Sequence, residues 1–146
     1  TLKQLDGVID VWLPDAKYAS DAIAGELSGF PGYVKANRAT LRELYRQVGP
    51  ELHTDEVGLL RRGMVIRHMV LPNGLAGSGE VFRWIAEYIS PHVHISLMNQ
   101  YFPTYKTVGH ATLGRAVSIE EYDAALEAFE QAGLNNGWGQ DYQEDV

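Results

Sequence analysis

Polar residues follow or interrupt three apolar segments of this sequence, and side chains of these types can hold a polar ligand. The first group is Pro14-Asp15-Ala16-Lys17, directly after the apolar run Val8–Leu13. Alternate residues of an extended chain share a face, so Asp15 and Lys17 would present a carboxylate and an ammonium side by side. That pair suits a ligand with hydroxyl groups and a carboxylate. A surface ion pair at a strand end, which is worth little energy, has the same pattern.

The second candidate is Arg67, which stands inside the apolar run Met64–Leu71. A buried guanidinium needs a partner, and either a structural carboxylate or an anionic ligand would serve. The third candidate is Asn99-Gln100-Tyr101, which follows the apolar run Val93–Met98. Amides and a phenol at a strand terminus can hold a polar ligand, and they can equally cap a loop.

The histidines are weaker candidates. His92 and His94 form a His-x-His pair, a spacing that occurs in metal sites, but no obvious third ligand lies nearby in the sequence. His68 would lie on the strand face opposite Arg67, where a structural role is favoured. The glycine-rich turn at residues 74–79 matches no phosphate-binding spacing.

The elements that must position these residues are strands alternating with helices. Apolar, β-branched runs predict strands at residues 8–13, 64–71 and 93–98, and residues 50–62 are compatible with a hairpin. Apolar residues at helical spacing predict four helices. The expected N-terminal caps are Ser20 or Asp21, Ser78, and the capping box that begins at Ser118, and Gly49 is an expected C-terminal cap. This order predicts a single α/β domain over residues 1–146, with three βα units, a parallel sheet and right-handed crossovers.

Composition narrows the classes of function. Acidic residues outnumber basic ones, 19 to 12, and the net charge of −7 would repel phosphate backbones, so we expect no nucleic-acid binding. No apolar run approaches the ~20 residues of a membrane helix and no signal-peptide pattern opens the chain, so we expect a cytoplasmic protein without a membrane partner. The chain has no cysteine, which excludes iron–sulfur ligation by its own thiolates. Its start, Thr1-Leu2-Lys3-Gln4, predicts a fragment or a trimmed version of a longer protein.

Three segments, in order, resemble the second half of radical S-adenosylmethionine proteins related to pyruvate formate-lyase activating enzyme. They are Asp10–Tyr18, Ile66–Asn73 and Met98–Pro103, and the ending Ala132–Trp138 is similar to one subgroup of uncharacterised homologues of that activase. The resemblance covers nearly the whole chain. It implies a partial TIM-like barrel of six βα units, of which this chain would supply units four to six.

The resemblance also implies a chemistry and a cofactor site. Members of this family bind a [4Fe-4S] cluster through three cysteines, and the cluster reduces S-adenosylmethionine to give a 5′-deoxyadenosyl radical. In the activase branch that radical takes a hydrogen from a glycine of a partner enzyme. Asp15 and Lys17 match an Asp-x-Lys beside the cofactor, and Arg67 matches an arginine that faces the site. Asn99, Gln100 and Tyr101 match the end of the sixth strand, where the activase carries a histidine that this chain lacks.

The missing cysteine motif separates this chain from its expected parent. The parent is expected to be a radical S-adenosylmethionine oxidoreductase whose partner is a glycyl radical enzyme or another protein substrate. The chain alone is expected to be catalytically incompetent, with no catalytic residue, no metal ligand and no bound cofactor. Two alternatives are a non-catalytic α/β module that binds a partner or a metabolite, and a metal-dependent barrel that uses His92 and His94.

A half-barrel would expose surface that a missing half should cover. The strand face bearing Val11, Leu13, Val65 and Met69 would line the barrel interior, and the first strand would form an open edge. Monomers tolerate an apolar face and an open edge poorly, so we expect a homodimer or a larger assembly. The alternative is that the loop at 99–117 covers this face and leaves a monomer.

Overall fold

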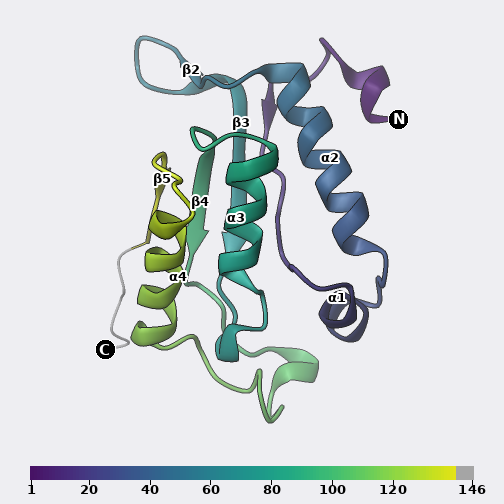
Figure 1. Ribbon diagram of the computed structural model, residues 1–146, viewed down its shortest axis with the longest axis vertical. Helices are drawn as coiled ribbons and strands as arrows, with labels where there is room; N and C mark the ends of the chain where they lie inside the picture. Colours follow the sequence, from purple (N-terminus) through teal and green to yellow (C-terminus); the bar gives the residue numbers. More distant parts are fainter. Residues whose placement is uncertain (141–146) are drawn as a thin grey trace.

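The fold is an α/β arrangement built on a mostly parallel sheet. The computed structural model describes residues 1–140. Four strands pair in parallel in the order β1-β3-β4-β5, and β2 pairs antiparallel with the start of β3 (Figure 1). The strands are β1 (Val11–Trp12), β2 (His53–Thr54), β3 (Leu60–Met69), β4 (His94–Met98) and β5 (Gly137–Trp138). The predicted parallel sheet and the hairpin around residues 50–62 are therefore confirmed.

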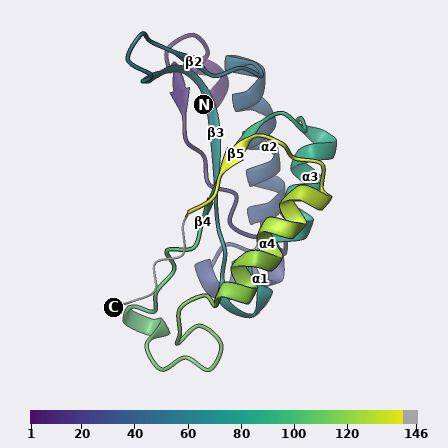
Figure 2. The same ribbon diagram turned by 90° about the vertical axis from the view of Figure 1, so that its left-hand side faces the viewer.

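Helices cover one face of the sheet. Figure 2 shows α2, α3 and α4 on the same side of the strands, while α1 packs against α2. The α-helices are α1 (Asp21–Ser28), α2 (Tyr33–Val48), α3 (Ser78–Tyr88) and α4 (Ile119–Gln131). Short 3₁₀ turns lie at η1 (Leu2–Leu5), η2 (Pro72–Gly74) and η3 (Tyr105–Thr107). No helix within residues 1–140 is long and apolar enough to cross a lipid bilayer.

The alternation of β3 separates the covered face from the uncovered one. Met64, Ile66 and His68 are almost fully buried beneath the helices, with exposed fractions of 2%, 0% and 0%. The residues between them, Val65 and Arg67, face the other side, because successive side chains of a strand point in opposite directions. The helix-covered core holds Phe82, Ile85, Leu41, Leu44, Ile95 and Leu97.

The first strand is shorter than predicted. Only Val11 and Trp12 form a continuous ladder with β3, and pairing resumes as an isolated bridge between Asp15 and Arg67. Pro14 lies between the two stretches and has no N–H to donate, although its carbonyl accepts from the Arg67 N–H at 2.8 Å. β3 begins earlier than predicted, at Leu60, because its first residues pair with β2.

Two local predictions fail for identifiable reasons. Ser78 does not cap α3: the cap is Gly77 in the left-handed conformation, and the Ser78 hydroxyl instead bonds His68 Nε2 at 2.8 Å. The segment Asn135-Asn136-Gly137 has residue types typical of a turn, but Gly137 opens β5 and pairs with Ile95. A Cβ at Gly137 would collide with the Ile95 carbonyl, so glycine permits this close approach. The predicted caps at Ser20, Gly49 and Ser118 are confirmed.

Candidate functional site

Asp15 and Arg67 form a polar pair near the carboxyl ends of β1 and β3. Arg67 Nε and Nη2 both donate to Asp15 Oδ1, at 2.8 and 2.7 Å. The two side chains are 34% and 45% exposed, for Asp15 and Arg67 respectively. The prediction of a buried guanidinium is therefore wrong, because Arg67 points to the sheet face without helices. Two partners were considered for the Arg67 guanidinium, a structural carboxylate and an anionic ligand, and in the structure its partner is the Asp15 carboxylate.

Helix α2 fixes the backbone on which Asp15 sits. Asn37 Nδ2 donates to the Asp15 carbonyl at 2.7 Å. The Tyr33 hydroxyl accepts from the Lys17 N–H at 2.7 Å and lies 3.4 Å from the Asp15 carbonyl. Burial raises the pKa of Tyr33, so its hydroxyl stays protonated at neutral pH. Neither residue was predicted from the sequence, where the available signal was two polar side chains one turn apart at the start of α2.

Lys17 does not pair with Asp15. Its side chain is exposed, and its ammonium makes no ion pair with any described residue. The carboxylate instead belongs to Arg67, so the two residues of the Asp-x-Lys segment have different surroundings. The Lys17 ammonium is left in solvent, where a ligand carboxylate could reach it.

The segment after β4 divides into a loop anchor and an exposed part. The Tyr101 hydroxyl donates to the Leu113 carbonyl at 2.8 Å, and its ring packs on the core. Tyr101 thus holds the loop at 99–117 in place. The Asn99 N–H donates to Gln140 Oε1 at 2.9 Å, and the exposed Gln100 donates to the sulfur of Met98 at 3.3 Å.

A row of side chains crosses the uncovered face at the level of Arg67. The parallel register places Asp15 beside Arg67, Arg67 beside Ser96, and Ser96 beside Trp138. We call these four residues the polar row. Two residues earlier on β4, and on the same face, the His94 ring lies 5.7 Å from the Trp138 ring. Ser96 could have been found from the alternation of β4, but Trp138 could not, since no short strand was predicted there.

The histidines have structural surroundings. His68 is buried between the Ala16 carbonyl and the Ser78 hydroxyl, so Nδ1–H donates to the carbonyl and Nε2 accepts from Ser78. Burial lowers the pKa of His68 to about 4. His92 contacts Asn135, and burial lowers the pKa of His94. Within residues 1–140 no three acidic or histidine side chains are grouped as metal ligands.

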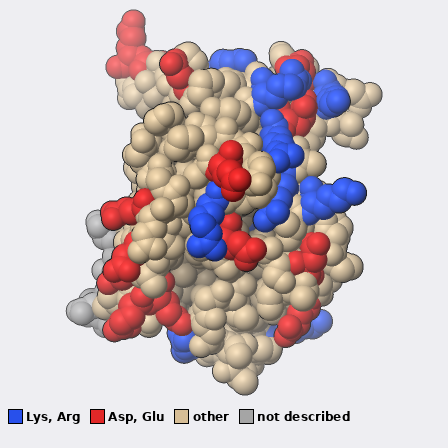
Figure 3. Space-filling view, in the orientation of Figure 1, with Lys and Arg blue, Asp and Glu red and all other residues tan. Residues whose placement is uncertain are grey.

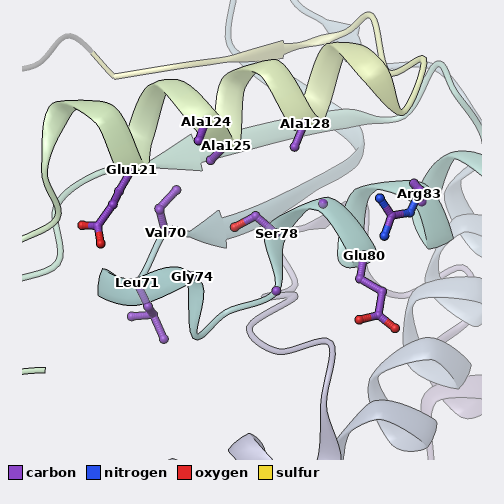
Figure 4. A pocket seen from close by; sticks show the side chains of 12 residues that line it. Val70, Leu71, Gly74, Ser78, Glu80, Arg83, Glu121, Ala124, Ala125 and Ala128 are labelled. Carbon is purple, nitrogen blue, oxygen red and sulfur yellow. The ribbon is translucent and has the colours of Figure 1, made fainter. Parts of the chain in front are cut away.

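A cavity of about 450 Å³ lies on the helix side, beyond the end of β3 and between α3 and α4 (Figure 4). Its floor is made by glycine, alanine and Val70, while Glu121 stands at one end and Glu80 and Arg83 at the other. Glu121 is already bound by Arg115 and by the Asn73 N–H, both at 2.7 Å. This cavity offers few free polar groups and lies on the face opposite Arg67.

Comparison with known proteins gives one significant relationship. The chain is 30% identical over 135 residues to a protein of Methanocaldococcus jannaschii described as "Uncharacterized protein MJ0674". The alignment covers 90% of this chain and 34% of the relative, so the chain spans about a third of the length of the relative it matches. No protein-family model matches the chain, and no solved structure matches it.

Proposed function

We propose that this chain is the C-terminal half of a radical S-adenosylmethionine enzyme of the activase-like branch, with its sheet forming units four to six of a partial (βα)6 barrel. The observation that carries the proposal is the polar row. It crosses the face of a parallel sheet that the helices leave uncovered, and it lies toward the carboxyl ends of β1 and β3. Parallel barrels gather their ligand sites at that end of the strands.

The residues suit an amino-acid-bearing nucleoside. The Asp15 carboxylate can accept hydrogen bonds from ribose hydroxyls, and its position is fixed by Arg67 and Asn37. The exposed Lys17 ammonium can bind the carboxylate of the ligand. Asn99 and Gln100 follow β4 at the same end of the sheet and add amide groups. We assign Tyr101 the role of positioning this segment, because its hydroxyl is bonded to Leu113.

The residues of this chain do not fit a [4Fe-4S] cluster, because the sequence contains no cysteine. The cluster ligands would have to come from another part of the parent protein. The relative from Methanocaldococcus jannaschii has room for such a part, since the alignment covers only 34% of it. In this proposal the parent acts in the cytoplasm on a glycyl radical enzyme or another protein, and the chain alone is inactive.

A non-catalytic binding module is the second candidate. Arg67 Nε and Nη2 both contact Asp15 Oδ1, and this pair can hold β1 to β3 without any ligand. The two candidates differ in what the polar row does: it binds a nucleoside in the first and only joins β1 to β3 in the second.

Binding of S-adenosylmethionine to the product of the whole reading frame tests the proposal. Under anaerobic conditions, Asp15→Asn and Lys17→Gln should each weaken binding about fivefold or more, because each removes a charged contact. Arg61→Gln is the matched control, since it breaks an exposed ion pair with Asp55 at the far end of β3. Equal affinities in the wild type and both site variants would reject the proposed site.

A further inference from the structure

The groove between α2 and α3 combines cations with aromatic rings. It has a volume of about 640 Å³ and lies on the outer face of the helix layer. Figure 3 shows Lys and Arg side chains gathered along α2, while acidic side chains gather over α4. The lining residues are Asp21, Val34, Lys35, Arg38, Ala39, Arg42, Trp84 and Tyr88. We call this surface the α2–α3 groove.

The two arginines are held on an aromatic base. The Arg38 guanidinium lies 5.0 Å from the centre of the Trp84 ring, and that of Arg42 lies 5.4 Å from both Trp84 and Tyr88. The two rings are themselves stacked, with centres 5.8 Å apart and planes at 17°. A guanidinium resting on a ring keeps its N–H edge free for a carboxylate, and its position is already fixed.

These cations lack acidic partners. Among residues 1–140, Lys35, Arg38 and Arg42 make no ion pair, whereas Arg46, one turn farther along α2, binds both Asp6 and Glu43. Asp21 lines the groove, but its carboxylate caps the Val34 N–H at 2.8 Å. Like charges one turn apart on a helix repel each other. An acidic ligand would remove this repulsion.

We infer that the α2–α3 groove is a docking surface for an acidic segment of a partner protein. Three cations spaced along two turns of α2 match several carboxylates carried by one peptide, and the exposed Tyr88 ring offers apolar contact beside them. A nucleic acid fits less well. Trp84 already contacts two guanidiniums and Tyr88, which restricts stacking of a base on its ring.

This inference does not rest on the proposed cofactor site. The groove lies on the helix layer, whereas the polar row lies on the uncovered face of the sheet. Failure of peptide binding at the groove and failure of S-adenosylmethionine binding at the polar row can therefore be measured separately. A variant in the groove should not change binding of S-adenosylmethionine by the longer protein.

Fluorescence anisotropy of a labelled glutamate-rich peptide, added to the 146-residue chain at low salt, tests the inference. We expect saturable binding that weakens as salt is added, and no binding of the same peptide with glutamine in place of glutamate. Arg38→Gln combined with Arg42→Gln should weaken binding about tenfold, because two exposed ion pairs are lost. Arg38→Lys with Arg42→Lys should give an intermediate affinity, since the positive charge stays but the planar guanidinium that stacks on the aromatic ring is lost.

Lys3→Gln combined with Lys106→Gln is the matched control, because it removes two positive charges outside the groove. Its affinity should stay within about twofold of the wild type, since distant exposed charges are screened. Circular dichroism confirms that each variant is folded. The inference is overturned if the peptide does not bind, if the groove and control variants behave alike, or if a single-stranded RNA of equal length binds more tightly than the peptide.

Discussion

His68 should make the stability of this protein depend on pH. Its folded-state pKa is about 4, against an ordinary value of 6.5, because burial disfavours the charged ring. The unfolded chain therefore binds more protons between these values, and stability falls as the pH falls from 6.5 toward 4. The expected loss is about 2 kcal/mol by pH ~5, measured by urea denaturation at several pH values.

A His68→Gln variant should lose most of this pH dependence, while His53→Gln, at an exposed position in β2, should keep it. The lowered pKa of His94 acts in the same direction, so a smaller slope should persist in His68→Gln. Glu43 and Glu121 have pKa values lowered to about 2, and they add a separate loss of stability below pH ~4.5. Parallel pH profiles for the wild type and His68→Gln would contradict this account.

The individual residues show what sequence alone can predict about a site. Alternation along β3 correctly separated His68 from Arg67, because strand periodicity is a local property. The exposure of Arg67 was not predictable from its apolar neighbours, since it depends on which face the helices cover. The support of Asp15 by Tyr33 and Asn37 was also missed. Those side chains bond to the backbone N–H of Lys17 and the backbone carbonyl of Asp15, and every residue type supplies such a carbonyl, so the sequence of that segment gives no signal.

At the scale of the elements, Gly63 is the residue that lets β3 pass close to the segment before β2. Its φ is +134°, and a Cβ there would lie 2.6 Å from Leu52 Cδ2 and 3.0 Å from the Glu51 carbonyl oxygen. Gly63→Ala should therefore destabilise the fold by about 2 kcal/mol or more. Gly58→Ala is the matched control: Gly58 also has a positive φ, of +83°, but has open space around it, so about 1 kcal/mol is expected. Equal free energies of unfolding for the two variants would show that the close contact is unimportant.

Helices and long strands were easier to predict than short strands. The stripes of α2, α3 and α4 and the capping box at Ser118 are local signals, and the structure confirms them. β5 has only two residues and begins with a glycine from a turn-like segment. This short strand forms because the outer side of β4 has backbone N–H and C=O groups to pair with, and those groups are brought together only when the sheet has assembled.

At the scale of the whole molecule, the uncovered face predicts self-association. Leu13 and Trp138 are each 55% exposed, and β1 forms one edge of the sheet within the described residues. Val65, which was expected to be exposed, is only 7% exposed, so the apolar surface is narrower than predicted. Figure 2 places residues 99–117 beyond the end of β4 rather than across the face, which does not favour the covered monomer.

Sedimentation velocity at micromolar concentrations should detect a dimer of this chain, since an apolar face beside an open edge favours symmetric pairing. Leu13→Glu should shift the equilibrium toward monomer by placing a charge on that face, whereas Val57→Glu, in the exposed loop after β2, should not. A single monomeric species over a wide concentration range would show that the uncovered face is stable in water.

The central claim is that this chain is half of a radical S-adenosylmethionine barrel, and the most direct measurement is formation of 5′-deoxyadenosine. The product of the whole reading frame would be reconstituted with iron and sulfide, reduced, and mixed with S-adenosylmethionine, with the 146-residue chain treated in parallel. We predict cleavage by the longer protein and none by the chain alone, which has no cysteine to hold a cluster. Failure of the reconstituted longer protein to bind a [4Fe-4S] cluster and cleave S-adenosylmethionine, or cleavage by the chain alone, would contradict the claim.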